Sequence, residues 1–219
     1  MSSTITLPNG STFTFIQIPE SPGVTDYSLT RKNSVAYVAS PFVPGVNQTF
    51  SWPGAQCWAL QFNLPKMRRF EAAPWEGFIS ELNGIANVFF FNLPGDRATA
   101  QGAADGAPVC ATVAGTNNAT SSFSLVTSGW TPNVFGQLLP GDYLNLGSRL
   151  YVVCEQVNSD SNGNATITIW PSLRESPAAG TVVNLINPGV LVRLANNDIG
   201  VHTDYTGLST LSVTAIEVR

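Results

Sequence analysis

Short runs in which apolar and polar residues alternate are the feature of this sequence that most restricts its fold. In the stretch from Asn162 to Pro171, NGNATITIWP, every second position is taken by Ala165, Ile167 and Ile169. Successive side chains of a β-strand point to opposite faces, so this period of two predicts a strand with one buried face. Pro171 has no backbone N–H to donate and is expected to end the strand.

The same alternation recurs along most of the chain. It predicts strands in the segments STITL, STFTFIQI, SVAYVA and CWALQFNL, and a short buried strand in NVFFFNL. The segment GDYLNLGSRLYVVCEQV contains two further runs joined at Gly147 and Ser148, a glycine-first pair typical of a type II′ hairpin turn. The tail, STLSVTAIEVR, alternates again and could pair back with the first block. The sequence therefore predicts an all-β protein.

One segment departs from this period. The positions i, i+3, i+4 and i+7, which share one face of an α-helix, are taken by Trp75, Phe78, Ile79 and Leu82. Pro74 is placed like the first residue of a helix and Gly84 like a C-terminal stop. We expect one helix near 74–83, with its apolar stripe packed on a sheet.

Small residues without any period separate two blocks of strands. The segment from Gly95 to Pro108, GDRATAQGAADGAP, predicts a long loop or linker. From Val109 to about Ile186 we expect roughly six short strands, a density typical of a small barrel.

The chain of 219 residues carries few charges. Asp, Glu, Lys and Arg make up 11% of it, against the roughly 25% usual for soluble domains. A surface so poor in charge suits burial against copies or partners, although an ordinary Thr- and Asn-rich β protein could share the composition. The net charge is −4 and the longest basic run is the short KMRR, so specific or tight nucleic-acid binding is not expected. No run approaches the ~18 apolar residues of a membrane span, so we expect no membrane insertion. We expect the protein to be made in the cytoplasm.

Candidate catalytic residues are few. His202 and Asp204, in VHTD, could hold a metal or form a base with its orienting carboxylate, but the chain has a single histidine and no nucleophile-elbow or phosphate-loop motif. Acidic pairs of Asp105 or Asp142 with Glu155 could form a glycosidase couple, without any specific spacing. We therefore expect no enzyme, no cofactor and no metal.

The cysteines and tryptophans leave one alternative open. The three cysteines, at 57, 110 and 154, are widely spaced and predict buried free thiols. Trp58 and Trp75 fall on core-facing positions, which leaves Trp52, Trp130 and Trp170 as candidates for stacking on sugar rings. A carbohydrate- or receptor-binding β module is the alternative function.

Two longer passages carry a resemblance. The first is Leu64 to Leu93, LPKMRRFEAAPWEGFISELNGIANVFFFNL, with its strand, basic joint, aromatic-led helix and aromatic strand. The second is Leu138 to Arg219, which contains LLPGDYLNLGSRLYVVCEQVNSDSNGNATITIWPSLRESPAAG and RLANNDIGVHTDYTGLSTLSVTAIE. Together they resemble the distal tail and tail-tip proteins of long-tailed bacteriophages, in which a barrel-like insert interrupts a β-sandwich.

The resemblance implies a structural virion protein of the phage tail tip or baseplate. In that family the subunits form a ring, commonly a hexamer, that connects the tail tube protein to the hub and the fibre-bearing tip. It implies a ring-forming β-sandwich domain from residues 1–102 and 184–219, interrupted by an OB-like small β-barrel at 103–183. In such an assembly the expected interface residues are Lys66, Arg68, Arg69, Trp130 and Trp170, although the three cations could equally lie on a solvated loop.

Overall fold

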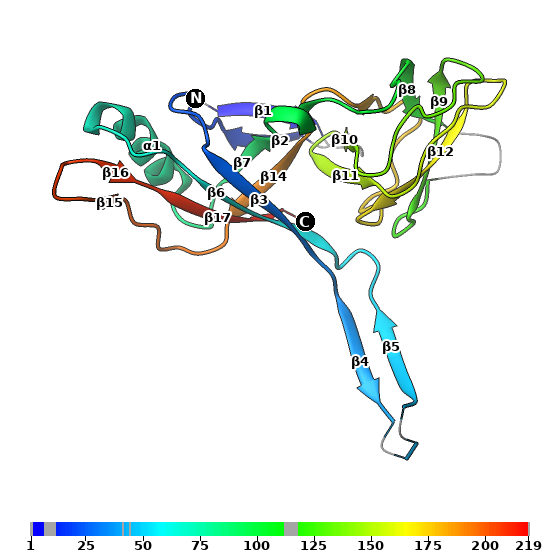
Figure 1. The fold of residues 1–219 in the computed structure, drawn as a ribbon, viewed down its shortest axis with the longest axis horizontal. Helices are drawn as coiled ribbons and strands as arrows, with labels where there is room; N and C mark the ends of the chain where they lie inside the picture. The colour runs from blue at the N-terminus through cyan, green and yellow to red at the C-terminus, as the bar shows by residue number, and fades with distance from the viewer. Residues whose placement is uncertain (1, 7–11, 41, 44, 112–117, 219) are drawn as a thin grey trace.

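The structure is a computed structural model that describes residues 2–6, 12–40, 42–43, 45–111 and 118–218. It consists of two β lobes lying side by side and a long two-stranded arm that leaves them at their junction (Figure 1). The described residues are mainly β-strand, which confirms the all-β prediction.

The first lobe is built on a seven-stranded sheet that draws on both ends of the chain. Its strand order is β1-β2-β7-β14-β17-β6-β3, and only β2 and β7 pair in parallel. The strands are β1 (Ser2–Thr6), β2 (Thr12–Ile16), β3 (Asp26–Lys32), β6 (Cys57–Asn63), β7 (Val88–Asn92), β14 (Gly189–Leu194) and β17 (Ser212–Glu217). The C-terminal strand lies between β14 and β6, so the tail does pair back with the first block.

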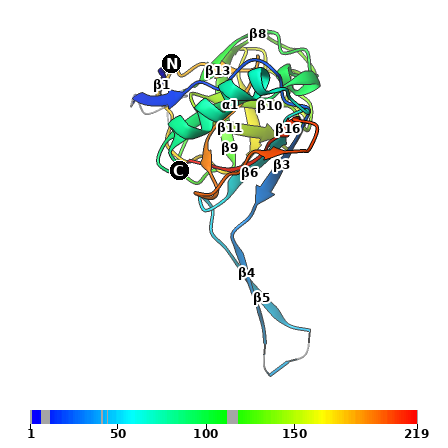
Figure 2. The same cartoon turned by 90° about the vertical axis from the view of Figure 1, so that its left-hand side faces the viewer.

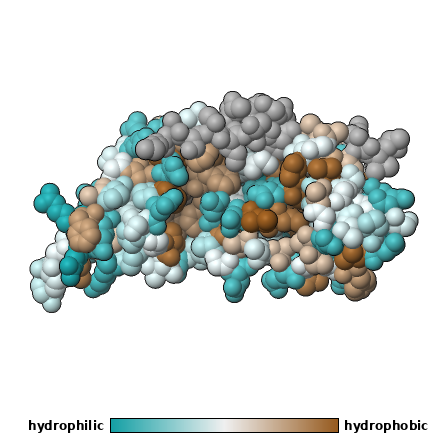
Figure 3. Space-filling view, turned by 90° about the horizontal axis from the view of Figure 1, so that it is seen from above, coloured by the Kyte–Doolittle hydropathy of each residue, from teal (hydrophilic) through white to brown (hydrophobic). Residues whose placement is uncertain are grey.

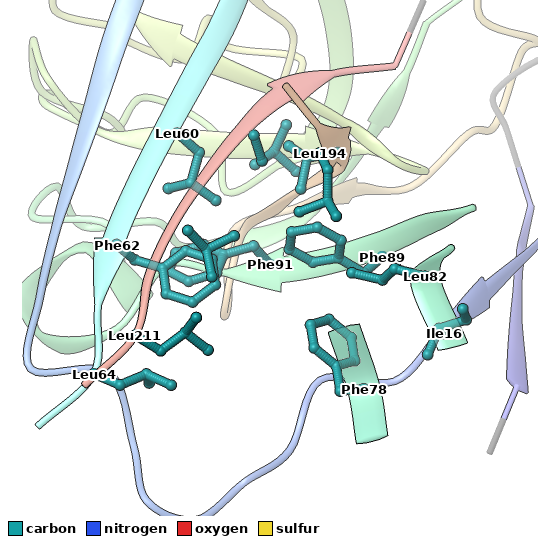
Figure 4. Packing of buried hydrophobic residues seen from close by; sticks show 14 of the residues in the cluster. Ile16, Leu60, Phe62, Leu64, Phe78, Leu82, Phe89, Phe91, Leu194 and Leu211 are labelled. Atoms are coloured by element: carbon teal, nitrogen blue, oxygen red, sulfur yellow. The ribbon is translucent and has the colours of Figure 1, made fainter. Parts of the chain in front are cut away.

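One α-helix, α1 (Arg69–Leu82), packs on this sheet. The ring of Trp75 lies 6.1 Å from that of Phe62, and the ring of Phe78 lies 5.4 Å from that of Phe89. Figure 4 shows Phe78 and Leu82 turned toward the aromatic residues of the sheet. The core positions predicted for Trp58 and Trp75 are confirmed, since both side chains are buried.

The predicted start of the helix was wrong. The helix begins at Arg69 because the Glu71 carboxylate accepts a hydrogen bond of 2.8 Å from the backbone N–H of Arg68, which caps the first turn. Pro74 therefore lies inside the helix, where it removes only the single hydrogen bond that residue 74 would donate to Phe70. The helix ends at Asn83, whose left-handed φ of 49° reverses the chain.

The second lobe is a six-stranded, nearly closed barrel-like sheet. Its strand order is β13-β10-β11-β12-β9-β8. The strands are β8 (Gly106–Cys110), β9 (Ser124–Trp130), β10 (Tyr143–Leu146), β11 (Arg149–Val153), β12 (Ala165–Trp170) and β13 (Val183–Asn184). A two-residue turn joins β10 to β11, with Gly147 at a φ of 59°, as the glycine-first pair predicted. In β12 the alternation holds, because Ala165, Ile167 and Ile169 are all buried.

The cores of the two lobes meet. Tyr143, Leu150 and Val152 of the second lobe belong to the same buried cluster as the first sheet. The indole Nε1 of Trp58 donates a hydrogen bond of 2.9 Å to the carbonyl of Leu150. The strand pattern fits the predicted insertion near 103–183, but whether the two lobes fold independently stays a prediction.

Three short elements complete the fold. The segment predicted as a loop, Gly95 to Pro108, is irregular only at 99–105, because it begins with the 3-10 helix η1 (Gly95–Ala98) and ends inside β8, which begins at Gly106. A small hairpin of β15 (His202–Thr203) and β16 (Ser209–Thr210) lies beside α1 (Figure 1). The second hairpin, of β4 (Val35–Ala39) and β5 (Asn47–Ser51), forms the projecting arm.

Candidate assembly interface

The arm, defined here as residues 33–52, is the most exposed apolar part of the described chain. No charged residue occurs in it. Among the described residues, eight of the fifteen exposed large apolar side chains belong to it, and Phe42, close to its tip, is 90% exposed. The eight are Val35, Tyr37, Val38, Phe42, Val43, Val46, Phe50 and Trp52.

The arm buries neither of its faces. The pairs Val35↔Ser51, Tyr37↔Thr49 and Ala39↔Asn47 place one set of side chains on one face, and Ala36↔Phe50 with Val38↔Gln48 place the rest on the other. Both faces point into solvent, as Figures 1 and 2 show. A two-stranded hairpin without a third layer is marginal in water, so the arm is a surface that gains stability when something covers it.

Both legs of the arm are held at the junction between the lobes. The indole Nε1 of Trp170 donates a hydrogen bond of 2.9 Å to Asn33 on the first leg. Just after the second leg, the backbone N–H of Gly54 donates to the Ser172 hydroxyl at 2.7 Å, and Arg174 donates to the Gly54 carbonyl at 2.9 Å. One short segment, residues 170–174, therefore fixes the direction in which the arm leaves the body.

A pair of buried charges stabilises this junction segment. The Arg174 guanidinium lies 2.7 Å from the Glu217 carboxylate, and the two side chains are 5% and 1% exposed. The same carboxylate accepts a hydrogen bond of 3.0 Å from the backbone of Trp58. Burial raises the pKa of Glu217, and the Arg174 guanidinium opposes that rise.

A second ion pair lies beside the first. Arg149 contacts Glu175 at 2.9 Å and also donates to the backbone carbonyl of Val218. Arg174 and Glu175 lie in the loop after β12, Arg149 begins β11 of the second lobe, and Glu217 ends β17 of the first. The four charges therefore connect the second lobe to the C-terminal strand of the first.

The predicted interface residues fall into two groups. Lys66, Arg68 and Arg69 are exposed at the start of α1, and Lys66 forms an exposed ion pair of 3.6 Å with Asp204. Trp170 is half-buried at the root of the arm, where its ring meets Trp58 edge-on at 4.5 Å. Trp130 is 3% exposed and donates its Nε1–H to Thr127, so it belongs to the core of the second lobe and offers no surface to a partner.

These positions also bear on the sugar-binding alternative. Of its three candidate tryptophans, Trp130 is buried and Trp170 is engaged by Trp58 and Asn33. Trp52 alone keeps about half of its side chain exposed, at 51%. The structure does not bring the three rings together into one stacking surface.

The candidate catalytic residues form no site: Asp204 has structural partners, and His202 is exposed. The Asp204 carboxylate accepts hydrogen bonds from the side chain and backbone of Thr206 and from the backbone of Leu208, and these bonds lower its pKa. His202 is exposed on β15, and no group of three His, Cys, Asp or Glu side chains able to hold a metal occurs in the described part of the chain.

The carboxylates proposed as an acidic couple have separate hydrogen-bond partners. Asp142 is buried and accepts backbone hydrogen bonds from Gln101, Gly102 and Leu139, whereas Glu155 is exposed and accepts a hydrogen bond from the side-chain hydroxyl of Thr168. Asp142 therefore organises the loop before β8.

The thiol prediction holds for two cysteines and fails for the third. Cys57 and Cys110 are buried and free, and burial raises the pKa of Cys110 to about 11. Cys154 is exposed because it lies directly after β11, where the chain leaves the barrel.

The sequence matches no protein-family model and no curated protein. No helix in the described ranges is long and apolar enough to cross a membrane.

Sequence reasoning missed the arm. The strand SVAYVA was predicted, but it was expected to lie in a sheet with a buried face. The signal that could have revealed the arm is the uninterrupted lack of charge from 33 to 52, combined with a second strand, NQTFS, that has no apolar stripe. A hairpin whose partner strand has nothing to bury cannot form the face of a core.

Proposed function

We propose that the chain is a structural assembly protein whose copies join through the arm into a closed ring. The ring would be of the kind formed by the proteins that the sequence resembles, at the tail tip of long-tailed bacteriophages. There it would connect the tail tube protein to the hub and the fibre-bearing tip, and the protein would be part of the virion.

The observation that carries this proposal is the arm. A segment free of charge, with eight large apolar side chains exposed, projects from the body on two anchored legs. Exposed apolar surface of this extent is typical of interaction sites. Neutral surface docks without leaving a charge buried and unpaired, which is the main cost of burying polar groups at an interface.

The low charge also fits a ring through which DNA passes. Phosphate affinity depends on the counterions that Lys and Arg release, and this chain has 10 such residues against 14 acidic ones. A ring of such subunits would let DNA through without gripping it. Specific nucleic-acid binding is accordingly not part of the proposed function.

The test is to shorten the arm without disturbing its root. Because Val35 pairs with Ser51, residues 36–50 can be replaced by Asn-Gly, a two-residue turn that suits this antiparallel pair. Native mass spectrometry at tens of micromolar should show a ring for the unchanged protein and a monomer with the same melting temperature for the short-arm variant. A monomeric unchanged protein, or a short-arm variant that still forms the ring, would contradict the proposal.

A further inference from the structure

The second lobe carries a groove that nothing in the first lobe covers. It lies at the seam where the edge strands β8 and β13 approach each other, joined by the bridge between Val109 and Val182. Its volume is about 430 Å³, and none of its lining residues is charged. Val182 and Ile186 stand on its rim, 66% and 67% exposed.

The wall of this groove is preformed. The segment 101–105 is held by the buried Asp142 carboxylate, which accepts the N–H of Gln101 at 2.8 Å, and by the buried Gln137, whose side chain accepts the N–H of Asp105 at 2.8 Å. Ala104 donates its backbone N–H to the carbonyl of Gln137 at 2.8 Å. A ligand therefore meets an ordered apolar surface, and little conformational freedom remains to be lost on binding.

The arm of the same molecule cannot fill this groove. In Figure 2 the strands β8 and β13 lie at the top of the molecule, and the arm leaves the opposite side and points down, away from them. Figure 3, which looks at the side remote from the arm, shows patches of apolar side chains among neutral and hydrophilic ones. Since Asn33 and Gly54 are tied to the junction segment, the arm is not free to swing round.

We propose that the groove receives the tip of the arm, around Phe42, from a second copy of the chain. The proposal rests on the function proposed above and names the surface at which the copies join. The tip presents Phe42, Val43 and Val46 without any charge, and the groove is uncharged as well. Its volume lies within the range of pockets that take a small apolar ligand, and an aromatic side chain with its neighbours is such a ligand.

The placement of the two surfaces also selects the symmetry. A two-fold dimer joins the same patch on both copies, whereas an arm and a groove on opposite sides of the molecule join unlike patches. Such a contact repeats from copy to copy and closes into a ring when the rotation between neighbours allows it.

The test uses two variants of the full chain, Phe42→Asp on the arm and Ile186→Asp on the rim of the groove. Both positions are exposed, so the fold should survive, which circular dichroism and melting will check. The matched control is Ile85→Asp, an exposed isoleucine in the loop after α1, which should assemble like the unchanged protein. By sedimentation velocity each of the two test variants alone should be a monomer.

Mixing the two variants is the decisive step. The Phe42→Asp chain keeps its groove and the Ile186→Asp chain keeps its arm, so together they can form one joint, and a 1:1 complex and nothing larger is expected. As an independent measurement, Phe42→Cys and Ile186→Cys chains that also carry Cys154→Ser should form a disulfide-linked dimer under mild oxidation. An Ile85→Cys chain on the same background should not form that dimer with Phe42→Cys.

The outcomes separate this inference from the proposed function. If Ile186→Asp assembles like the unchanged protein while Phe42→Asp does not, the arm joins copies elsewhere or the groove serves a different protein, and only the present inference is overturned. It is also overturned if both variants are monomers but their mixture shows neither the 1:1 complex nor the disulfide-linked dimer. If the unchanged protein is itself a monomer and no cross-link forms, both proposals are wrong.

Discussion

Replacing Trp75 by alanine tests whether α1 is held on the sheet by its aromatic core. The side chain is 1% exposed and packs against Phe62 at 6.1 Å and Phe78 at 5.8 Å, the latter edge-on. Truncating a fully buried Trp lowers the free energy of unfolding by about 3–5 kcal/mol. That figure includes about 0.5–1.5 kcal/mol for each aromatic pair that is lost. For a chain of this length the melting temperature should fall by roughly 6–20 °C.

Two further variants make the result specific. The indole Nε1 of Trp75 is buried without an acceptor among the described residues, so Trp75→Phe keeps a ring, removes this unsatisfied donor and should cost less than half as much. Phe70→Ala, on the same helix but 71% exposed, should change the free energy of unfolding by less than about 0.5 kcal/mol.

The assay is urea unfolding followed by far-ultraviolet circular dichroism, which gives the midpoint and the slope for each variant. An equal midpoint for Trp75→Ala and Phe70→Ala would refute the core assignment. A Trp75 that stacked on sugar would lose ligand binding on truncation, with little change in melting.

Three other predictions concern the thiols, the buried ion pair and the domain division. In the native protein at pH 8 a thiol reagent should modify Cys154 rapidly and Cys57 and Cys110 only after denaturation, and rapid reaction of all three would contradict their burial. Arg174→Met should destabilise the fold by about 3–5 kcal/mol near pH 8, because it leaves the Glu217 carboxylate buried without its counter-charge. A carboxyl group with a raised pKa destabilises the fold as pH rises and it becomes ionised, so the stability lost in this variant should be smaller near pH 5. The same loss of stability at both pH values would argue against charge as the cause. Replacing residues 103–183 with a short Gly/Ser bridge should leave a first lobe that still melts cooperatively. Its stability should be lower, since Trp58 loses Leu150 as a hydrogen-bond acceptor. If the shortened chain and the isolated 103–183 segment are both unfolded, the two lobes form one domain.

The strands of the sheets could be read from the sequence where one face is buried. In β12 the alternation of Ala165, Ile167 and Ile169 gave both the element and its inward face, because the period of a strand is fixed by its geometry. The same reasoning located β7, β17 and the turn at Gly147.

The start of α1 and the arm could not be read in this way, for different reasons. Pro74 is a strong local signal for a first helical residue, but the hydrogen bond from Arg68 to Glu71 and the burial of Ala72 extend the helix past it. The arm has strand residues without a buried face, and whether a strand joins a sheet or projects from it depends on contacts distant in sequence, such as that of Trp170 with Asn33.

A few of the scarce charges of this chain are paired where the lobes and the arm meet. Arg149, Arg174, Glu175 and Glu217 form two pairs at the junction, although a buried pair adds little stability over apolar residues of the same size. Their directional hydrogen bonds, however, fix the junction segment that orients the arm, and a ring closes only if every arm leaves at the same angle. In urea unfolding, we therefore expect the free energy of unfolding of the double variant Arg174→Met/Glu217→Leu to lie no more than about 1–2 kcal/mol below that of the unchanged protein, or above it. In electron micrographs its assemblies should vary in diameter, whereas those of the unchanged protein should be uniform. Uniform rings from a stable double variant would show that packing alone sets the angle of the arm.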